Sequence, residues 1–446
     1  MQGSRERKNN AIKMTLAATR LRRQSQTPVT FKFKIRNEKR NRKSGALEHF
    51  KMLFVEAKWV YNSILSQTDK KIMGSDVRKA SSFSQKEFDT VVHKDKDGND
   101  ITSEVTHLRS SQRDAVITQV KNALKALKKR KAEGYKVGRL KFKSDVNAIN
   151  LKQYGITHYM SGPNSYHVQG FEYDVRVVGM RQLRKLDKDG IPYELSSARL
   201  LQEGGDFFIE QTIWVDREIW RNYKNRNKKA YKHEVNALDM GCSKTATDAF
   251  GKVYNVQVEE SERLKRLQRK SRRQLVAAGW DPKKGKQKKV PRSNNWYKTQ
   301  RLIHKEYARL DNRKDAAAIQ LTNKVLSENE VLVIQDENLT GWKENGHGKK
   351  VQHGILGRVK ERLVASPQVR VINRWVPTTK LCTNCGKTYD DITQRERRFV
   401  CPHCGHDDGE RDCHSAKDMV WLYLNMMDKI GLDGTEFKRE DFDEGL

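Results

Sequence analysis

Four of the six cysteines in this 446-residue chain occur as two Cys-x-x-Cys pairs. The pairs are Cys382 with Cys385 and Cys401 with Cys404. Two thiolate pairs at this separation are the ligand pattern of a four-cysteine zinc ribbon. Four thiolates complete the coordination of Zn²⁺, so we expect a structural ion that leaves no open position for chemistry. The remaining cysteines, Cys242 and Cys413, are unpaired in the sequence and are expected to be packing residues.

Three carboxylates stand where side chains can converge at one edge of a sheet. Asp239 ends an apolar run before Gly241, Glu337 follows the run VLVI, and Asp412 opens the last predicted helix. Shared carboxylates can hold two divalent ions roughly 4 Å apart and activate water against a phosphodiester. Oxygen ligands of this kind select Mg²⁺ or Mn²⁺. Singly, each acid is more often a turn residue, a solvated strand end or an N-cap, but together they predict a metal-dependent nuclease.

The charge balance points to a polyanionic partner. Lys plus Arg number 89 against 56 Asp plus Glu, a formal net charge of +33, while hydrophobic residues make up 36%. Such an excess disfavours a compact state unless a polyanion neutralises it, which makes nucleic acid the expected partner and a small-metabolite enzyme an unlikely class. No apolar run is long enough to span a bilayer, no secretory core follows the N-terminus, and the thiolate pairs favour a reducing compartment. We therefore expect a cytoplasmic, nucleoid-associated protein of a prokaryotic cell.

Hydropathy patterning predicts a multidomain protein of α/β plus β-barrel class. Phe31, Phe33 and Ile35 alternate with basic residues, as in a half-buried strand, and β-type alternation returns between about 138 and 217. Between these segments, Phe50 and Leu53 belong to one face of a helix. The predicted layout runs in chain order. It comprises a basic disordered arm (1–26), a barrel (27–44 and 136–232) interrupted by a helical insertion (45–135), an α/β nuclease domain (233–378 and 410–432), the ribbon (379–409) and an acidic, solvated tail (433–446).

Several segments together resemble one known family. They are ALDMG with the hairpin residues Lys244 to Thr247, LDNRKDAAAIQLTNKVL, VLVIQDENLTGW, PTTKLCTNCG, CPHCGHDDGERDCHSAKDM and the basic segment KVGRLKFKS. From about Thr27 onward, the chain is similar to the TnpB proteins of insertion sequences and to their relatives, the compact type V CRISPR effectors. The two groups share every one of these motifs, so the sequence leaves open whether the gene is part of a transposable element or of a CRISPR system.

The resemblance implies an RNA-guided DNA endonuclease with a RuvC domain of ribonuclease-H-like fold. It implies that Asp239, Glu337 and Asp412 hold Mg²⁺ for two-metal hydrolysis, and that guide RNA and target DNA are the partners. The barrel would be the wedge domain and the helical insertion a recognition domain, which together read a short flanking motif. The ribbon would be a target nucleic-acid-binding domain, and the assembly a monomer or a homodimer on one RNA.

One position departs from the family pattern. Members commonly carry a catalytic Glu at the end of the second-motif strand, where this chain has Gln335. Residues 335 and 337 share a face if the strand continues, so we expect Glu337 to supply the carboxylate, with Asp336 as the second choice.

Three other functions remain open from the sequence. One is a non-cleaving RNA-guided DNA-binding protein of the same fold. Another is a zinc-ribbon transcription or chromatin factor. The third is a transposase. Transposases usually carry their acids in the order Asp, Asp, Glu, whereas the order Asp, Glu, Asp in this chain favours a RuvC domain.

Overall fold

The computed structural model describes residues 2–36, 41–42, 45–94, 98–226, 230–283, 290–342, 344, 351, 354–389, 391–392 and 396–443. The chain forms two compact units, Met1–Arg226 and Asn227–Leu446. Each unit has hydrophobic clusters of its own. None of the helices in the described part of the chain combines the length and apolar character needed to cross a bilayer.

The first unit is built on a barrel-like, seven-stranded antiparallel sheet of order β4-β8-β9-β1-β7-β6-β5. The strands are β1 (Gln26–Ile35), β4 (Ala148–Leu151), β5 (His158–Gly162), β6 (Ser165–Val168), β7 (Val175–Val178), β8 (Glu194–Glu203) and β9 (Asp206–Asp216). In β1 the residues Phe31, Phe33 and Ile35 are buried and their neighbours exposed, as the alternation predicts. Since β1 pairs with both β9 and β7, the early strand lies inside the sheet formed by much later residues, as expected.

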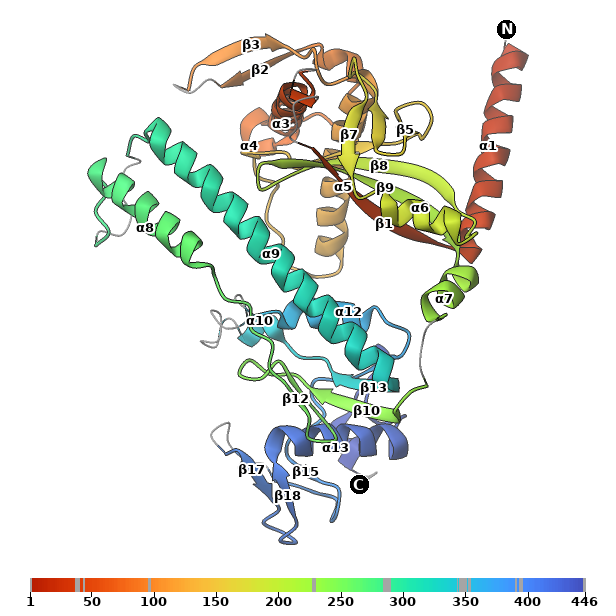
Figure 1. Ribbon diagram of the computed structural model, residues 1–446, viewed down its shortest axis with the longest axis vertical. Coiled ribbons are helices and arrows are strands. Elements are labelled where there is room, and N and C mark those ends of the chain that lie inside the picture. The colour runs from red at the N-terminus through yellow and green to blue at the C-terminus, as the bar shows by residue number, and fades with distance from the viewer. Residues whose placement is uncertain are drawn as a thin grey trace. The chain divides into compact units, whose positions relative to one another are not determined.

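A mainly helical block lies in the chain between β1 and β4. It contains α3 (Ala46–Thr68), α4 (Lys70–Met73), η1 (Ala80–Ser82), η2 (Gln85–Phe88), the hairpin β2 (Thr90–Lys94) with β3 (Asp100–Glu104), and α5 (Ser110–Ala132). Phe50 and Leu53 are fully buried, which confirms the predicted apolar face of α3. The hairpin of β2 and β3 was not predicted from the sequence. Two further helices, α6 (Arg181–Lys188) and α7 (Arg217–Asn225), complete this unit (Figure 1).

The N-terminal arm is helix α1 (Gln2–Ser25) and not the disordered segment expected from its charge. Ala, Leu and Arg are strong helix formers, and the segment holds no proline to stop them. Its last turn is held to the sheet because Arg22 and Arg23 each lie 3.0 Å from the carboxylate of Glu194. The expectation of disorder was therefore wrong for this segment.

The second unit contains a five-stranded sheet of order β12-β11-β10-β13-β14. Its strands are β10 (His233–Asp239), β11 (Ala246–Asp248), β12 (Val253–Tyr254), β13 (Asn329–Gln335) and β14 (Val369–Ile372). The first three form an antiparallel meander, whereas β10 with β13 and β13 with β14 are parallel. The apolar runs that precede Asp239 and Glu337 in the sequence are strands β10 and β13.

Helices cover both faces of this sheet (Figure 1). The helices of this unit are α8 (Glu262–Ala277), α9 (Asn294–Glu328), α10 (Leu339–Trp342), α12 (Leu356–Val364), α13 (Arg411–Asn425), η4 (Leu432–Gly434) and α14 (Arg439–Asp443). Of these, α8 packs on α9 and not on the sheet. Side chains along β10 alternate between the two faces of the sheet. Leu238 packs in the hydrophobic cluster that includes residues of α9 and α12, whereas Ala237 packs on the other face in the cluster that includes residues of α13. Every second residue of β10 is therefore directed toward α13.

The four cysteines lie in two small hairpins, β15 (Leu381–Cys382) with β16 (Lys387–Thr388) and β17 (Arg398–Val400) with β18 (Asp407–Glu410). β18 leads directly into α13. The described part of the C-terminal tail keeps its acidic residues exposed, but Phe442 is fully buried in the cluster of α13. The tail is thus anchored to the core by one aromatic side chain.

Candidate functional site

Two parallel strands bring the first two predicted carboxylates to one edge of the sheet. Leu238 of β10 lies opposite Ile334 of β13, so both strands end at the same level. Asp239 is the last residue of β10 and continues the face of Ala237 toward α13. Glu337 follows two residues after the end of β13. The carboxyl ends of parallel strands are where α/β sheets place ligand-binding side chains.

The third carboxylate enters from the helix that covers this face. Asp412 lies in the first turn of α13, where the N-cap position is held by Glu410. Asp412 is therefore not the N-cap residue, which removes the simplest structural explanation for it. Its carboxylate lies 3.1 Å from Arg411 and 3.8 Å from Lys244, and Lys244 also pairs with Glu410. Cations thus border the site on one side.

The charges of both other acids act on Asp239. Burial first, and then the charges of Asp412 and Glu337, raise the pKa of Asp239 to about 7 against the opposing effect of Arg411 and Lys244. Burial also raises the pKa of Glu337 to about 7, opposed by the charges of Lys360 and Arg374. Acids that repel one another and bind protons near neutrality are typical of sites where a cation completes the charge balance.

The donor set fits Mg²⁺ or Mn²⁺, because all three groups offer carboxylate oxygens. Among the described residues, the three carboxylates are not one of the clusters whose ligand atoms all lie within 4.8 Å of one another. The arrangement is therefore wider than a closed cage for one ion. An open set of carboxylates suits Mg²⁺, which keeps several of its waters when protein-bound.

The side chains of Gln335 and Asp336 are engaged elsewhere. Asp336 accepts from Lys360 at 2.7 Å and from Nε of Arg374 at 3.0 Å. Gln335 donates its amide to the carbonyls of Asn373 and Val376 and accepts from the hydroxyl of Thr378. Gln335 therefore connects the end of β13 to the segment 373–378, which leaves Glu337 as the carboxylate whose charge acts on Asp239.

The four predicted zinc ligands come together. Sγ of Cys382 lies 3.7 Å from Sγ of Cys404, and Sγ of Cys385 lies 3.7 Å from Sγ of Cys401. Sulfurs bound tetrahedrally to Zn²⁺ at 2.3 Å would be about 3.8 Å apart. Hydrogen bonds from Asn384 and from the backbone at His406 lower the pKa of Cys404 to about 6, which favours the thiolate that binds metal.

A second buried cluster was not predicted. His414 and Asp418 lie one turn apart on α13 and are almost fully buried, and Nδ1 of His414 is 2.8 Å from Asp408 of β18. Phe399 stacks on the imidazole at 3.6 Å between ring centroids. Burial raises the pKa of Asp418 to about 9. The His-x-x-x-Asp spacing was visible in the sequence, but only the fold brings Asp408 and the ribbon strand to it.

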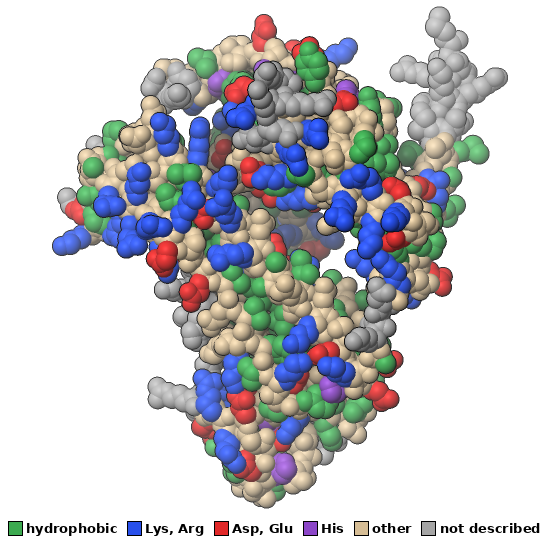
Figure 2. Space-filling model, viewed as in Figure 1, with side chains coloured by type: hydrophobic (Ala, Val, Ile, Leu, Met, Phe, Trp, Pro, Cys, Tyr) green, Lys and Arg blue, Asp and Glu red, His purple; other side chains and the backbone are tan. Residues whose placement is uncertain are grey.

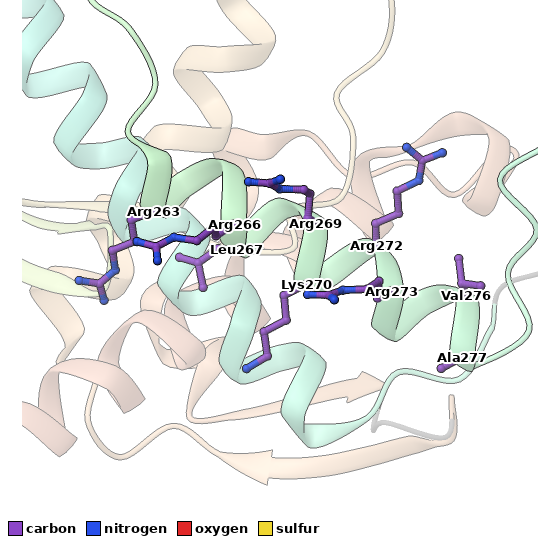
Figure 3. Close-up of a pocket in the computed structure, with 9 residues that line it drawn as sticks. All are labelled: Arg263, Arg266, Leu267, Arg269, Lys270, Arg272, Arg273, Val276 and Ala277. Atoms are coloured by element: carbon purple, nitrogen blue, oxygen red, sulfur yellow. The ribbon is translucent and has the colours of Figure 1, made fainter.

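A basic concave surface of about 1070 Å³ lies along α8 (Figure 3). Its charged lining is Arg263, Arg266, Arg269, Lys270, Arg272 and Arg273. Figure 2 shows Lys and Arg side chains gathered over the part of the molecule where Figure 1 places α8.

Comparison with known proteins confirms the resemblance predicted from the motifs. Residues 364–419 match the family model described as the Cas12f1-like TNB domain, a span that includes the four cysteines and Asp412. A curated relative from Streptomyces pristinaespiralis, described as a putative RNA-guided DNA endonuclease, is 26% identical over 161 residues. That match spans 34% of this chain and only 38% of the relative.

Two solved structures align over much of the chain at low similarity. One is Cas12f1 in a complex with single guide RNA and target DNA, with a TM-score of 0.47 and 12% identity over 89% of this chain and 99% of that one. The other is CasPhi-2 (Cas12j) bound to crRNA and phosphorothioate-DNA, with a TM-score of 0.36 and 10% identity over 89% of this chain and 91% of that one.

Proposed function

We propose that this protein is an RNA-guided DNA endonuclease whose nuclease site is formed by Asp239, Glu337 and Asp412. The observation that carries the proposal is that Asp239 and Glu337 follow the paired ends of two parallel strands, while α13, whose first turn holds Asp412, packs against β10. Asp412 also lies in the segment that matches the Cas12f1-like TNB domain. The strand order β12-β11-β10-β13-β14, with an antiparallel meander followed by parallel strands, is that expected of a ribonuclease-H-like RuvC domain. The curated relative supports the same class of activity.

The three carboxylates would hold two Mg²⁺ ions, which supply an activated water and stabilise the leaving oxygen of the phosphodiester. Asp239 would be the shared ligand, because the charges of both other acids act on it. Arg411 and Lys244 offset the negative charge around Asp412, and Lys360 and Arg374 do the same beside Glu337. These cations are also placed to attract the phosphate backbone of an incoming strand.

Guide RNA and target DNA would be held chiefly through their phosphates. In RNA-guided nucleases, base pairing reads the target sequence while the protein contacts backbone and a short flanking motif. The net charge of +33 and the arginine-lined surface of α8 suit that task. We assign the barrel-like sheet and the helical block of the first unit to guide and flanking-motif recognition, and the ribbon to target nucleic-acid binding.

A second candidate function rests on Gln335. If the family's Glu position is the only one from which a carboxylate can serve the site, the protein binds guided DNA without cutting it. The position of Glu337 supports cutting, because it follows the end of β13 by two residues and β13 pairs in parallel with β10, which ends at Asp239.

The test begins with the RNA that copurifies when the gene is expressed with its native flanking DNA. One RNA species with a fixed scaffold end and a variable guide end supports the proposal and defines a target. Cleavage of that target with Mg²⁺, and not with EDTA or with Asp239→Ala, then establishes the nuclease. Guided binding without cleavage would favour the second candidate, and heterogeneous or absent RNA would overturn both. A guide that matches CRISPR spacers would indicate an effector, and a guide that extends past a transposon end would indicate TnpB.

A further inference from the structure

Trp375 differs from the other tryptophans of the chain in what surrounds its ring. The sequence contains eight tryptophans. Trp59, Trp220 and Trp296 lie against other rings, Trp214 and Trp280 lie under arginines, and Trp342 and Trp421 pack against core clusters. The side chain of Trp375 is 72% exposed. Among the described residues, its ring makes no stacking or cation–π contact.

The turn that carries Trp375 is held rigidly. Residues 373–376 follow β14, and the amide of Val376 donates to the carbonyl of Asn373 at 3.2 Å. The side chain of Asn373 also accepts from the backbone amide of Trp375 at 3.1 Å. Since Val376 is buried next to this turn, the exposed ring is presented from an ordered support and not from a loose loop.

The same turn is tied to the end of the strand that leads to Glu337. Nε2 of Gln335 donates to the carbonyls of Asn373 and Val376, on either side of Trp375. Arg374 pairs with Asp336, and the charge of Arg374 lowers the pKa of Glu337. Trp375 is therefore fixed at the border of the carboxylate site, next to a guanidinium that is close enough to affect Glu337.

We propose that Trp375 stacks on an unpaired base of the DNA strand that enters the carboxylate site. An exposed aromatic ring on a rigid support binds any base through its face, and a neighbouring cation contacts the adjacent phosphate. This inference rests on the proposed function and adds to it a substrate-binding residue that acts on single strands. A base-paired strand would not offer the face of its base, so the ring also selects single-stranded substrate.

The test measures binding of an end-labelled single-stranded DNA in an Asp239→Asn background, which prevents cutting. Trp375→Ala should weaken binding by about 5- to 150-fold, the range for one stacked base. Trp375→Phe retains a ring and should stay within about threefold of the parent. Leu424→Ala is the matched control, because Leu424 is 60% exposed on the last turn of α13, about 18 Å along the helix from Asp412, and should leave binding unchanged.

A set of DNAs, each with one abasic nucleotide, then locates the base. One abasic position should reproduce the loss with the parent protein and cause no further loss with Trp375→Ala. Equal binding by Trp375→Ala and the parent, or abasic penalties that persist in full in Trp375→Ala, would overturn the inference. Because the exposed ring buries little area, melting temperatures of both Trp375 variants should match the parent.

Guided cleavage by the unmodified protein separates this inference from the proposed function. If it cuts DNA and Trp375→Ala binds single strands normally, only the stacking is wrong. If it neither binds nor cuts DNA, both fail.

Discussion

The side-chain amide of Gln335 donates a hydrogen bond to the backbone carbonyl of Val376 at 2.7 Å. A second hydrogen bond from the same nitrogen reaches Asn373, and the oxygen accepts from Thr378 at 3.0 Å. A carboxylate at this position could donate to neither carbonyl. Gln335 thus has a structural use, since it joins the end of β13 to the segment that leads into the ribbon.

Gln335→Glu is therefore expected to destabilise the protein and not to increase cutting. Loss of two donors leaves two carbonyls facing a carboxylate, a cost on the order of 1–3 kcal/mol for each unsatisfied group. Thermal unfolding should show a lower melting temperature, and guided cleavage should not rise. Faster cleavage with unchanged stability would instead identify position 335 as the catalytic one. Glu337→Gln is the matched comparison, because it should abolish cutting without lowering stability.

Asp239→Asn should have opposite effects on activity and on stability. Loss of the shared ligand is expected to reduce cleavage by at least about a thousandfold, or ~4 kcal/mol of transition-state stabilisation. In EDTA, however, the amide removes a buried charge that Asp412 and Glu337 repel. The melting temperature should then rise by roughly 2–4 °C for each ~1 kcal/mol gained. A fall in melting temperature would show that the carboxylate stabilises the fold without metal.

Cleavage should increase as the pH rises from about 6 to 8. The pKa values of Asp239 and Glu337 are both raised to about 7, so protons occupy the ligand oxygens below that pH and compete with Mg²⁺. Single-turnover rates measured across this range should fall on the acid side. Higher Mg²⁺ should move the midpoint to lower pH, because the ion displaces the protons. A midpoint that does not respond to Mg²⁺ would assign the titration to another group.

Removal of zinc should disorder the ribbon and, through it, impair the nuclease site. The described core of the ribbon is small, with Cys382, Phe399 and Cys401 as its buried members, so a zinc ion bound by the four cysteines would supply most of its stability. β18 runs directly into α13, which carries Asp412. We expect chelation or Cys385→Ser to lower both ribbon protection in hydrogen exchange and cleavage. Added zinc should restore cleavage by the chelated protein but not by the variant. Full cleavage activity of the zinc-free protein would show that the nuclease site does not depend on the ribbon.

Asp418→Asn should stabilise the protein, and more so at higher pH. The pKa of Asp418 is raised to about 9 from an ordinary value of 3.8, so the folded state holds a proton that the unfolded state releases. Stability therefore declines as the pH rises from about 4 to 9, and the neutral amide avoids that loss. Melting curves at pH 5 and pH 8.5 should show a growing advantage over the parent. Asp428→Asn, at an exposed position, is the control. A lower melting temperature at both pH values would show that the native carboxyl is ionised and paired with His414.

Local patterns predicted the elements whose residues are close in sequence. The Cys-x-x-Cys pairs predicted the four-sulfur cluster, and the alternation of Phe31, Phe33 and Ile35 predicted a half-buried strand. The disorder predicted from the charge of residues 2–25 is not found, because helix propensity and the ion pairs with Glu194 outweigh the repulsion between the basic side chains. The hairpin of β2 and β3 was missed because its short strands lack a clear apolar face.

Composition and spacing are enough to identify the donors: four thiolates, three carboxylates at element ends, and a large excess of cations. How these donors are used follows from the fold. Asp336 pairs with Lys360 and Arg374, Gln335 binds backbone carbonyls, and α13 with Asp412 packs against the strand that ends at Asp239. The physical reason is that a spacing rule acts over a few residues, whereas these contacts depend on the register of β10 with β13 and on the packing of α13 across them.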